Sequence, residues 1–140
     1  MEIKLHYDVD GEDFTTAGEA SSDVKRQLRR LGVDPDIIRR VAVCMYEGEI
    51  NMVIHADGGT IEVDITSERI FMILQDKGPG IPDIPSALQE GFSTANQMAR
   101  DLGFGAGMGL PNMKRYADDM EVTSEVGVGT RIEITVNINA

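Results

Sequence analysis

The chain has 140 residues, of which 41% are hydrophobic and 26% are charged, and these values are typical of one folded globular domain over residues 1–140. Its formal net charge of −11 comes from 24 acidic and 13 basic residues, so its surface would repel the phosphates of DNA or RNA, and direct nucleic acid binding is not expected. No apolar run approaches the ~20 residues that a membrane span needs, and the first residues lack the basic and then apolar pattern of a signal peptide. These features predict a cytoplasmic protein with no membrane association.

The first part of the chain predicts a strand followed by a helix. Residues 2–9 alternate apolar and polar side chains, as a strand with one buried face does, and the polar residues 10–20 predict a loop. A helix is expected next, with Ser21 or Ser22 as its N-cap and Gly32 just past its end. The polar side of this helix is basic, against the sign of the whole chain, at Arg26, Arg29 and Arg30.

A longer helix is predicted to follow. Asp34 is suited to cap it and Pro35 to occupy its first position, and an apolar stripe continues to about Ala56. The single cysteine, Cys44, lies within this helical pattern. We therefore interpret it as a small core residue and not as a disulfide or metal partner.

The second half of the chain predicts two hairpins and two shorter helices. These elements are expected at residues 60–65 (strand), 69–75 (strand), 82–90 (short helix), 110–117 (helix), 120–124 (strand) and 130–138 (strand). The whole order of elements predicts an α+β fold. We expect a two-layer sandwich, with one mostly antiparallel sheet and helices on one of its faces.

Glu47 and Asn51 lie four residues apart in the second predicted helix and therefore project from the same helix face. An amide oxygen can bind Mg²⁺ directly, and a nearby carboxylate can orient or deprotonate a nucleophile. An exposed polar pair is the more common meaning of this spacing when it stands alone. Glu49, between the two, is expected to project elsewhere and to face solvent.

Asp76 follows the apolar run at residues 70–74 and precedes a Gly78-Pro79-Gly80 turn. An acid at the end of a buried strand is costly unless a donor bonds it, and a carboxylate can only accept. The exocyclic amine of adenine is one suitable donor. A turn-forming aspartate is an equally good interpretation of the same residue.

Glycines alternate along one segment ahead of a predicted helix, at Gly103, Gly105, Gly107 and Gly109. Glycines allow close backbone approach, and the start of a helix presents free N–H groups and a positive dipole end to a phosphate. No Gly-Lys-Ser/Thr sequence follows, so the segment is not a Walker loop, and its strict alternation argues against a merely flexible loop. Cations near enough to reach a phosphate, or to have ordinary surface roles, are Arg100, Lys114 and Arg115.

A fourth segment, Gly127-Val128-Gly129-Thr130, is on its own a hairpin turn. In their order along the chain, however, the four segments resemble the motifs of the gyrase, Hsp90, histidine-kinase and MutL (GHKL) ATPases. Glu47-x-x-x-Asn51 matches the N box, Asp76-x-Gly78-x-Gly80 the first glycine box, Gly105-x-Gly107-x-Gly109 the second, and Gly127-x-Gly129-Thr130 the third. The resemblance implies the Bergerat, or histidine-kinase-like, ATPase fold.

The resemblance also implies a role for each matching residue in a site for ATP and Mg²⁺. Glu47 would be the general base and Asn51 the Mg²⁺ ligand, while Asp76 would bind the adenine amino group with help from Thr130. The residues that would shape the pocket and the phosphate lid, or contact the nucleotide, are Gly78, Gly80, Gly103, Gly105, Gly107, Met108, Gly109, Leu110 and Lys114.

Within this family the short chain looks most like the bacterial anti-sigma regulatory factors, which are serine/threonine protein kinases. This implies a small antagonist protein as phosphoacceptor, a sigma factor as bound partner, and a homodimer formed through the first strand and helix. The glycine-rich lid looks more like that of sensor kinases, but no phosphoacceptor histidine region is present. Two alternatives are an ATP-gated protein-binding module without phosphoryl transfer and a detached histidine-kinase catalytic domain acting in trans.

Overall fold

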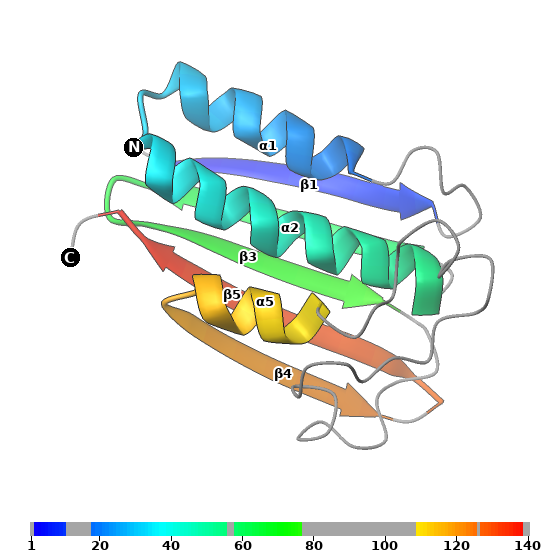
Figure 1. The fold of residues 1–140 in the computed structure, drawn as a ribbon. Coiled ribbons are helices and arrows are strands. Elements are labelled where there is room, and N and C mark those ends of the chain that lie inside the picture. Colours follow the sequence, from blue (N-terminus) through cyan, green and yellow to red (C-terminus); the bar gives the residue numbers. More distant parts are fainter. Residues whose placement is uncertain (1, 11–17, 56–57, 77–108, 126, 139–140) are drawn as a thin grey trace.

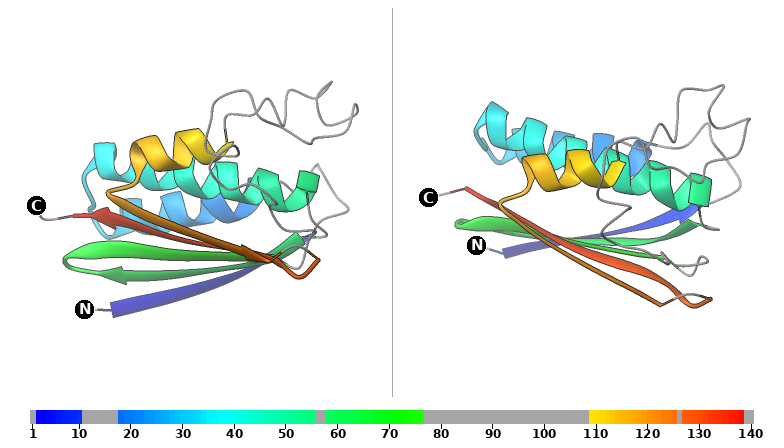
Figure 2. Two further views of the ribbon diagram at one scale, coloured as in Figure 1. Left: turned by 90° about the horizontal axis from the view of Figure 1, so that it is seen from below. Right: turned by 60° about the horizontal axis from the view of Figure 1, so that its bottom comes forward.

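The computed structural model describes residues 2–10, 18–55, 58–76, 109–125 and 127–138, and these form a sheet covered on one face by helices (Figure 1). The elements, in chain order, are β1 (Glu2–Asp10), α1 (Glu19–Arg30), α2 (Pro35–His55), β2 (Gly58–Thr66), β3 (Arg69–Asp76), α5 (Gly109–Tyr116), β4 (Asp119–Glu125) and β5 (Gly129–Asn137). Figure 2 shows the three described helices together on the same side of the sheet. The predicted α+β two-layer sandwich is therefore confirmed. None of the helices in these ranges is long and apolar enough to cross a membrane.

The sheet has five described strands in the order β1-β2-β3-β5-β4, and each pair of neighbours is antiparallel. Two hairpins, β2–β3 and β4–β5, are joined in the middle of the sheet, where β3 pairs with β5. β1 forms one outer edge and pairs only with β2 among these strands. Because β3 ends where β5 begins, two segments far apart in the sequence meet at one end of the sheet.

The core lies between the sheet and the helices. Alternate residues of β2, β3 and β5 are buried on the helix side, in the period of two that a half-covered strand requires. Cys44 of α2 is fully buried among these side chains, and burial raises the pKa of its thiol to about 12. The burial confirms the prediction that Cys44 is a core residue. A thiol with so high a pKa stays protonated and is therefore chemically inert.

The predicted ends of the strands and of the second and last helices agree with the structure to within two residues, while the short helix expected at 82–90 lies outside the described residues. The predicted cap of α1 is wrong. α1 starts earlier, at Glu19, with Gly18 as N-cap in the left-handed conformation (φ +99°), and no side chain of the cap residue bonds the helix. Ser21 lies inside the first turn, where its hydroxyl donates to the Gly18 carbonyl at 2.9 Å.

Glu49 of α2 supplies the missing cap, so the expectation that it faces solvent is also wrong. Its side chain is only 2% exposed. Its Oε2 accepts from the backbone N–H groups of Gly18 (2.8 Å) and Ala20 (3.1 Å), and its Oε1 accepts from that of Ser21 (3.0 Å). The free N–H groups and positive dipole end of α1 make burial of this carboxylate tolerable.

Candidate functional site

The described residues of the four segments that resemble GHKL motifs belong to elements that meet at one end of the sandwich. The C-terminal half of α2 carries Glu47 and Asn51, β3 ends at Asp76, α5 begins at Gly109, and β5 begins at Gly129. In Figure 1 the end of α2, the arrowhead of β3 and the starts of α5 and β5 all lie towards the same side of the molecule. The topology therefore brings Glu47, Asp76 and Thr130, which are far apart in the sequence, towards one end of the described fold.

A hydrogen bond joins the segment at the end of β3 to the one at the start of β5. The backbone N–H of Thr130 donates to Oδ1 of Asp76 at 3.1 Å. Thr130 is 8% exposed, and its Oγ1 lies 3.2 Å from Oγ of Ser124 on the neighbouring strand β4. The Thr130 backbone N–H thus contacts the Asp76 carboxylate at the end of a strand whose inward side chains are buried.

A second hydrogen bond joins the α2 segment to α5. Nδ2 of Asn112 donates to Oε1 of Glu47 at 3.3 Å, and both side chains are half-buried. Asn112 lies outside the four motifs found in the sequence. The sequence feature that could have identified it is its position as a polar residue in the first half of a short helix, between Leu110 and Met113, which are buried core residues.

Arg40 fixes the other end of α5 against α2. Its Nε donates to the Tyr116 carbonyl at 2.9 Å, and its Nη2 pairs with Oδ1 of Asp118 at 3.0 Å. The Asn137 backbone N–H donates to Asp118, and with Arg40 it holds the pKa of that carboxyl below its usual range. α5 is therefore anchored at its C-terminal end, which sets where Asn112 reaches α2.

Gly48 lets α2 approach β3 closely. A Cβ on this glycine would lie 2.0 Å from Cδ2 of Leu74, which is closer than two carbon atoms can approach. Gly48 was not among the predicted site residues, although a glycine inside a helix often has a packing reason. By resting on β3, this turn of α2 carries Glu47 and Asn51 towards the end of the sheet at Asp76.

The remaining predicted site residues divide into two groups. Leu110 is 8% exposed and belongs to the core, whereas Lys114 is exposed in the last turn of α5. The other predicted residues lie outside the described residues, namely Gly78, Gly80, Gly103, Gly105, Gly107 and Met108.

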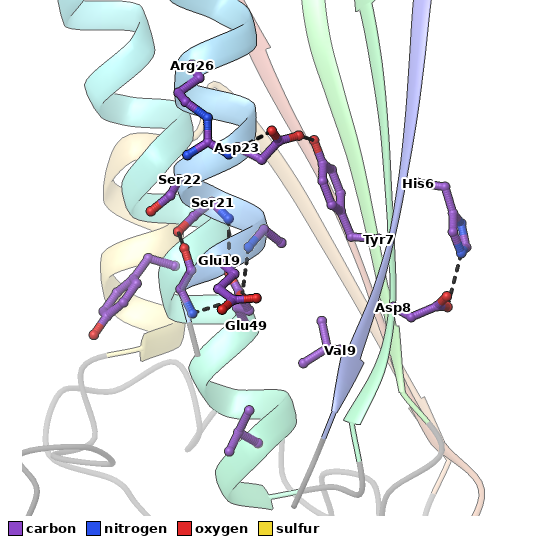
Figure 3. A pocket seen from close by; sticks show the side chains of 14 residues that line it. His6, Tyr7, Asp8, Val9, Glu19, Ser21, Ser22, Asp23, Arg26 and Glu49 are labelled. Atoms are coloured by element: carbon purple, nitrogen blue, oxygen red, sulfur yellow. Dashed lines mark hydrogen bonds and ion pairs between the residues drawn. The ribbon is translucent and has the colours of Figure 1, made fainter. Parts of the chain in front are cut away.

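A separate pocket of about 1030 Å³ lies between β1 and the start of α1 (Figure 3). Of the predicted nucleotide residues that the structure describes, none lines this pocket. In it Tyr7 and Asp23 point toward each other, and the Tyr7 hydroxyl donates to Asp23 Oδ2 at 2.6 Å. Burial, and then this hydrogen bond to a carboxylate, raise the pKa of Tyr7. The same bond, with help from Arg26 at 2.9 Å, lowers the pKa of Asp23. The arrangement ties β1 to α1.

The sequence is similar to a known domain family and to several named proteins. The profile of the histidine kinase-like ATPase domain matches residues 12–136. Serine/threonine-protein kinase RsbT of Bacillus subtilis (strain 168) is 31% identical over 125 residues, which cover 86% of each chain. An anti-sigma F factor of Bacillus licheniformis is 28% identical over 118 residues, or 80% of this chain and 77% of that one.

A solved structure shows the same fold. The crystal structure of the RsbU and RsbW domains of a Mycobacterium tuberculosis protein superposes with a TM-score of 0.65 at 15% identity. The match covers 95% of this chain and 32% of that one. The predicted resemblance is confirmed: the chain belongs to the histidine kinase-like ATPase domain family, whose members bind nucleotides.

Proposed function

We propose that this protein is an ATP-dependent serine/threonine protein kinase that phosphorylates a small antagonist protein and sequesters a sigma factor. The observation that carries the proposal is a pair of hydrogen bonds at one end of the sandwich. The bond from Thr130 to Asp76 joins the third motif segment on β5 to the end of β3, and the bond from Asn112 to Glu47 joins α5, which begins at Gly109, to α2. The names of the two relatives, a serine/threonine-protein kinase and an anti-sigma factor, support the same activity and partners.

The donor set fits a nucleotide with its metal ion. Asp76 is fixed by a backbone N–H at 3.1 Å, so it can accept from the adenine amino group without rearranging. Asn51, half-buried and one helical turn beyond Glu47, would offer its amide oxygen to Mg²⁺. When bound, Mg²⁺ neutralises phosphate charge, which matters on a protein with a net charge of −11.

Glu47 has the position of a general base. Its Oε1 is held by Asn112, and within the described ranges no other side chain hydrogen-bonds it, so Oε2 can take the proton of a serine or threonine hydroxyl. The hydrogen bond from Asn112 would help to orient the carboxylate before the acceptor arrives. Leu110 and Met113 keep α5 in register by their burial in the core.

We also propose that the protein is a homodimer formed through β1 and α1. β1 is an outer strand of the described sheet, and such a strand can pair with a second copy. α1 lies beside it and is tied to it by the bond from Tyr7 to Asp23.

Titration calorimetry and phosphoryl transfer test the kinase assignment. ATP should bind only with Mg²⁺ present, and Asn51→Ala should abolish that binding; equal binding by the variant would remove the metal role. Glu47→Ala should keep ATP binding but lose transfer of radiolabelled phosphate to a protein captured with ATP present. Transfer at the parent rate would exclude Glu47 as base, and binding without transfer by the parent protein would instead favour an ATP-gated module.

A further inference from the structure

A groove between α1 and α2 has a charge opposite to that of the protein as a whole. It has a volume of about 750 Å³. Its apolar lining includes Val33, Ile38, Val43 and Tyr46, and Tyr46 is 41% exposed. Such an exposed aromatic side chain in a hollow is typical of a protein-binding surface.

Basic residues are concentrated in the part of the sequence that runs from α1 into α2, the two helices that form this groove. Residues 25–40 hold six of the chain's 13 basic residues against two acidic ones, although the net charge of the chain is −11. Those that line the groove are Lys25, Arg29 and Arg39. Arg39 pairs with Asp36 at 3.0 Å, which offsets its charge.

Lys25 and Arg29 are available to a partner. Within the part of the chain that the structure describes, neither has a carboxylate at ion-pair distance. Arg29 is exposed and Lys25 is half-buried. Among the described residues that line the groove, the single carboxylate is that of Glu47, the base of the proposed reaction.

Glu47 also marks one end of the groove. α1 and α2 run side by side in opposite directions (Figure 1), and the bond from Ser21 to Glu49 sets the start of α1 beside the turn that holds Glu47. On the other side of α2, Glu47 receives Asn112 from α5. Glu47 therefore lies between the groove and the helix that follows the glycine-rich segment.

Resting on the kinase function proposed above, we propose that this groove binds an acidic, extended segment of the phosphoacceptor protein and leads its serine or threonine to Glu47. Acceptor and nucleotide then approach the base from opposite sides of α2. An acidic partner is repelled by most of this protein's surface but attracted by the groove, so charge both selects and orients the segment.

The helix spacing predicts where the acidic residues of that segment lie. Lys25 and Arg29 come four and eight residues after Ser21, which places them about 6 Å and 12 Å from it along α1. An extended chain advances about 3.3 Å per residue, so the matching acidic residues lie about two and four positions from the phosphoacceptor. Residues spaced by two share one face of an extended segment, which leaves the alternate side chains for the apolar lining.

Fluorescence anisotropy with synthetic peptides tests this proposal. The first labelled probe is a short peptide with one serine, aspartates two and four residues after it, and leucines between them. The second probe has the aspartates before the serine. Each probe also has a version in which lysine replaces aspartate. One aspartate peptide should bind at least about tenfold more tightly than its lysine version. Lys25→Glu with Arg29→Glu should remove that difference without changing the affinity for ATP.

Arg30→Glu is the matched control for Arg29→Glu. It makes the same charge change one residue later on the same helix, but Arg30 does not line the groove. Its effect on peptide binding should stay below about twofold. The proposal is overturned if aspartate and lysine peptides bind alike, if the two arginine variants weaken binding equally, or if a single-stranded oligonucleotide binds as well as the aspartate peptide.

The outcomes also separate this proposal from the kinase assignment. Binding that depends on Arg29, without phosphoryl transfer to any peptide, supports the groove and refutes the kinase. Transfer to a peptide whose KM is insensitive to Lys25 and Arg29 supports the kinase and refutes the groove. If both hold, Arg29→Glu should raise KM for the peptide and leave kcat unchanged.

Discussion

Replacing Glu49 with alanine removes the acceptor of three backbone N–H groups at the start of α1. Hydrogen bonds to a charged group contribute roughly 1.5–3 kcal/mol each, and a buried donor left without a partner costs about 1–3 kcal/mol. Removing the charge also removes the free-energy cost of burying a carboxylate that is only 2% exposed, which offsets part of this loss. Taking the lower bound for each bond and allowing for that offset, we expect a loss of about 3 kcal/mol in the free energy of unfolding.

Urea denaturation followed by circular dichroism measures this loss. Glu49→Gln keeps one acceptor oxygen but turns an N–H₂ donor towards an N–H donor, so it should lose about 1–2 kcal/mol. Glu68→Ala, at an exposed turn, is the control and should change stability by less than about 0.5 kcal/mol. Hydrogen exchange at Gly18, Ala20 and Ser21 should become faster in the alanine variant. A loss below about 1 kcal/mol, or unchanged exchange at these amides, would refute the capping role.

Asn112→Ala should lower kcat by about tenfold with ATP affinity unchanged, because only the orientation of the base is lost; the matched control Asn137→Ala should leave kcat alone, and a similar fall there would contradict the assignment. Gly48→Ala should cost about 1–3 kcal/mol through overpacking against Leu74, and an unchanged urea midpoint would show that α2 can move away. Hydrogen bonds to neighbouring carboxylates raise the pKa of His6 above 6.5, so its contribution to stability should be present below about pH 6.5 and disappear as the pH rises through the folded-state pKa. An NMR titration of the His6 ring that gives 6.5 or less would disprove this.

The sequence was sufficient for the elements whose burial follows a local period. β3, expected at 69–75 and found at Arg69–Asp76, is an example, because alternate residues meet the same core along its whole length. Glu49 was misjudged since the period of α2 describes only α2, whereas its partners are backbone amides 28 to 31 residues earlier. Almost every residue has a backbone N–H, so the sequence does not show which of these groups a distant side chain will bond.

The candidate site was predictable in the same unequal way. The motif order pointed to Glu47 and Asp76, but not to what holds them. Asn112 reaches Glu47 because Arg40 at the far end of α5, together with buried Leu110 and Met113, holds this helix against the rest of the fold. The hydrogen bond from Arg40 joins positions 76 residues apart. Such long-range geometry has no local pattern from which it could be inferred.

The cap that Glu49 provides has a consequence for the order in which the chain can become structured. α1 is synthesised before its cap, because Glu49, which bonds the first turn of α1, lies in the C-terminal half of α2. A peptide covering α1 alone will fray at Glu19, and a nascent chain must extend past residue 49 and dock α2 before that turn is stable. The two helices are therefore one folding unit, although a short turn separates them along the chain.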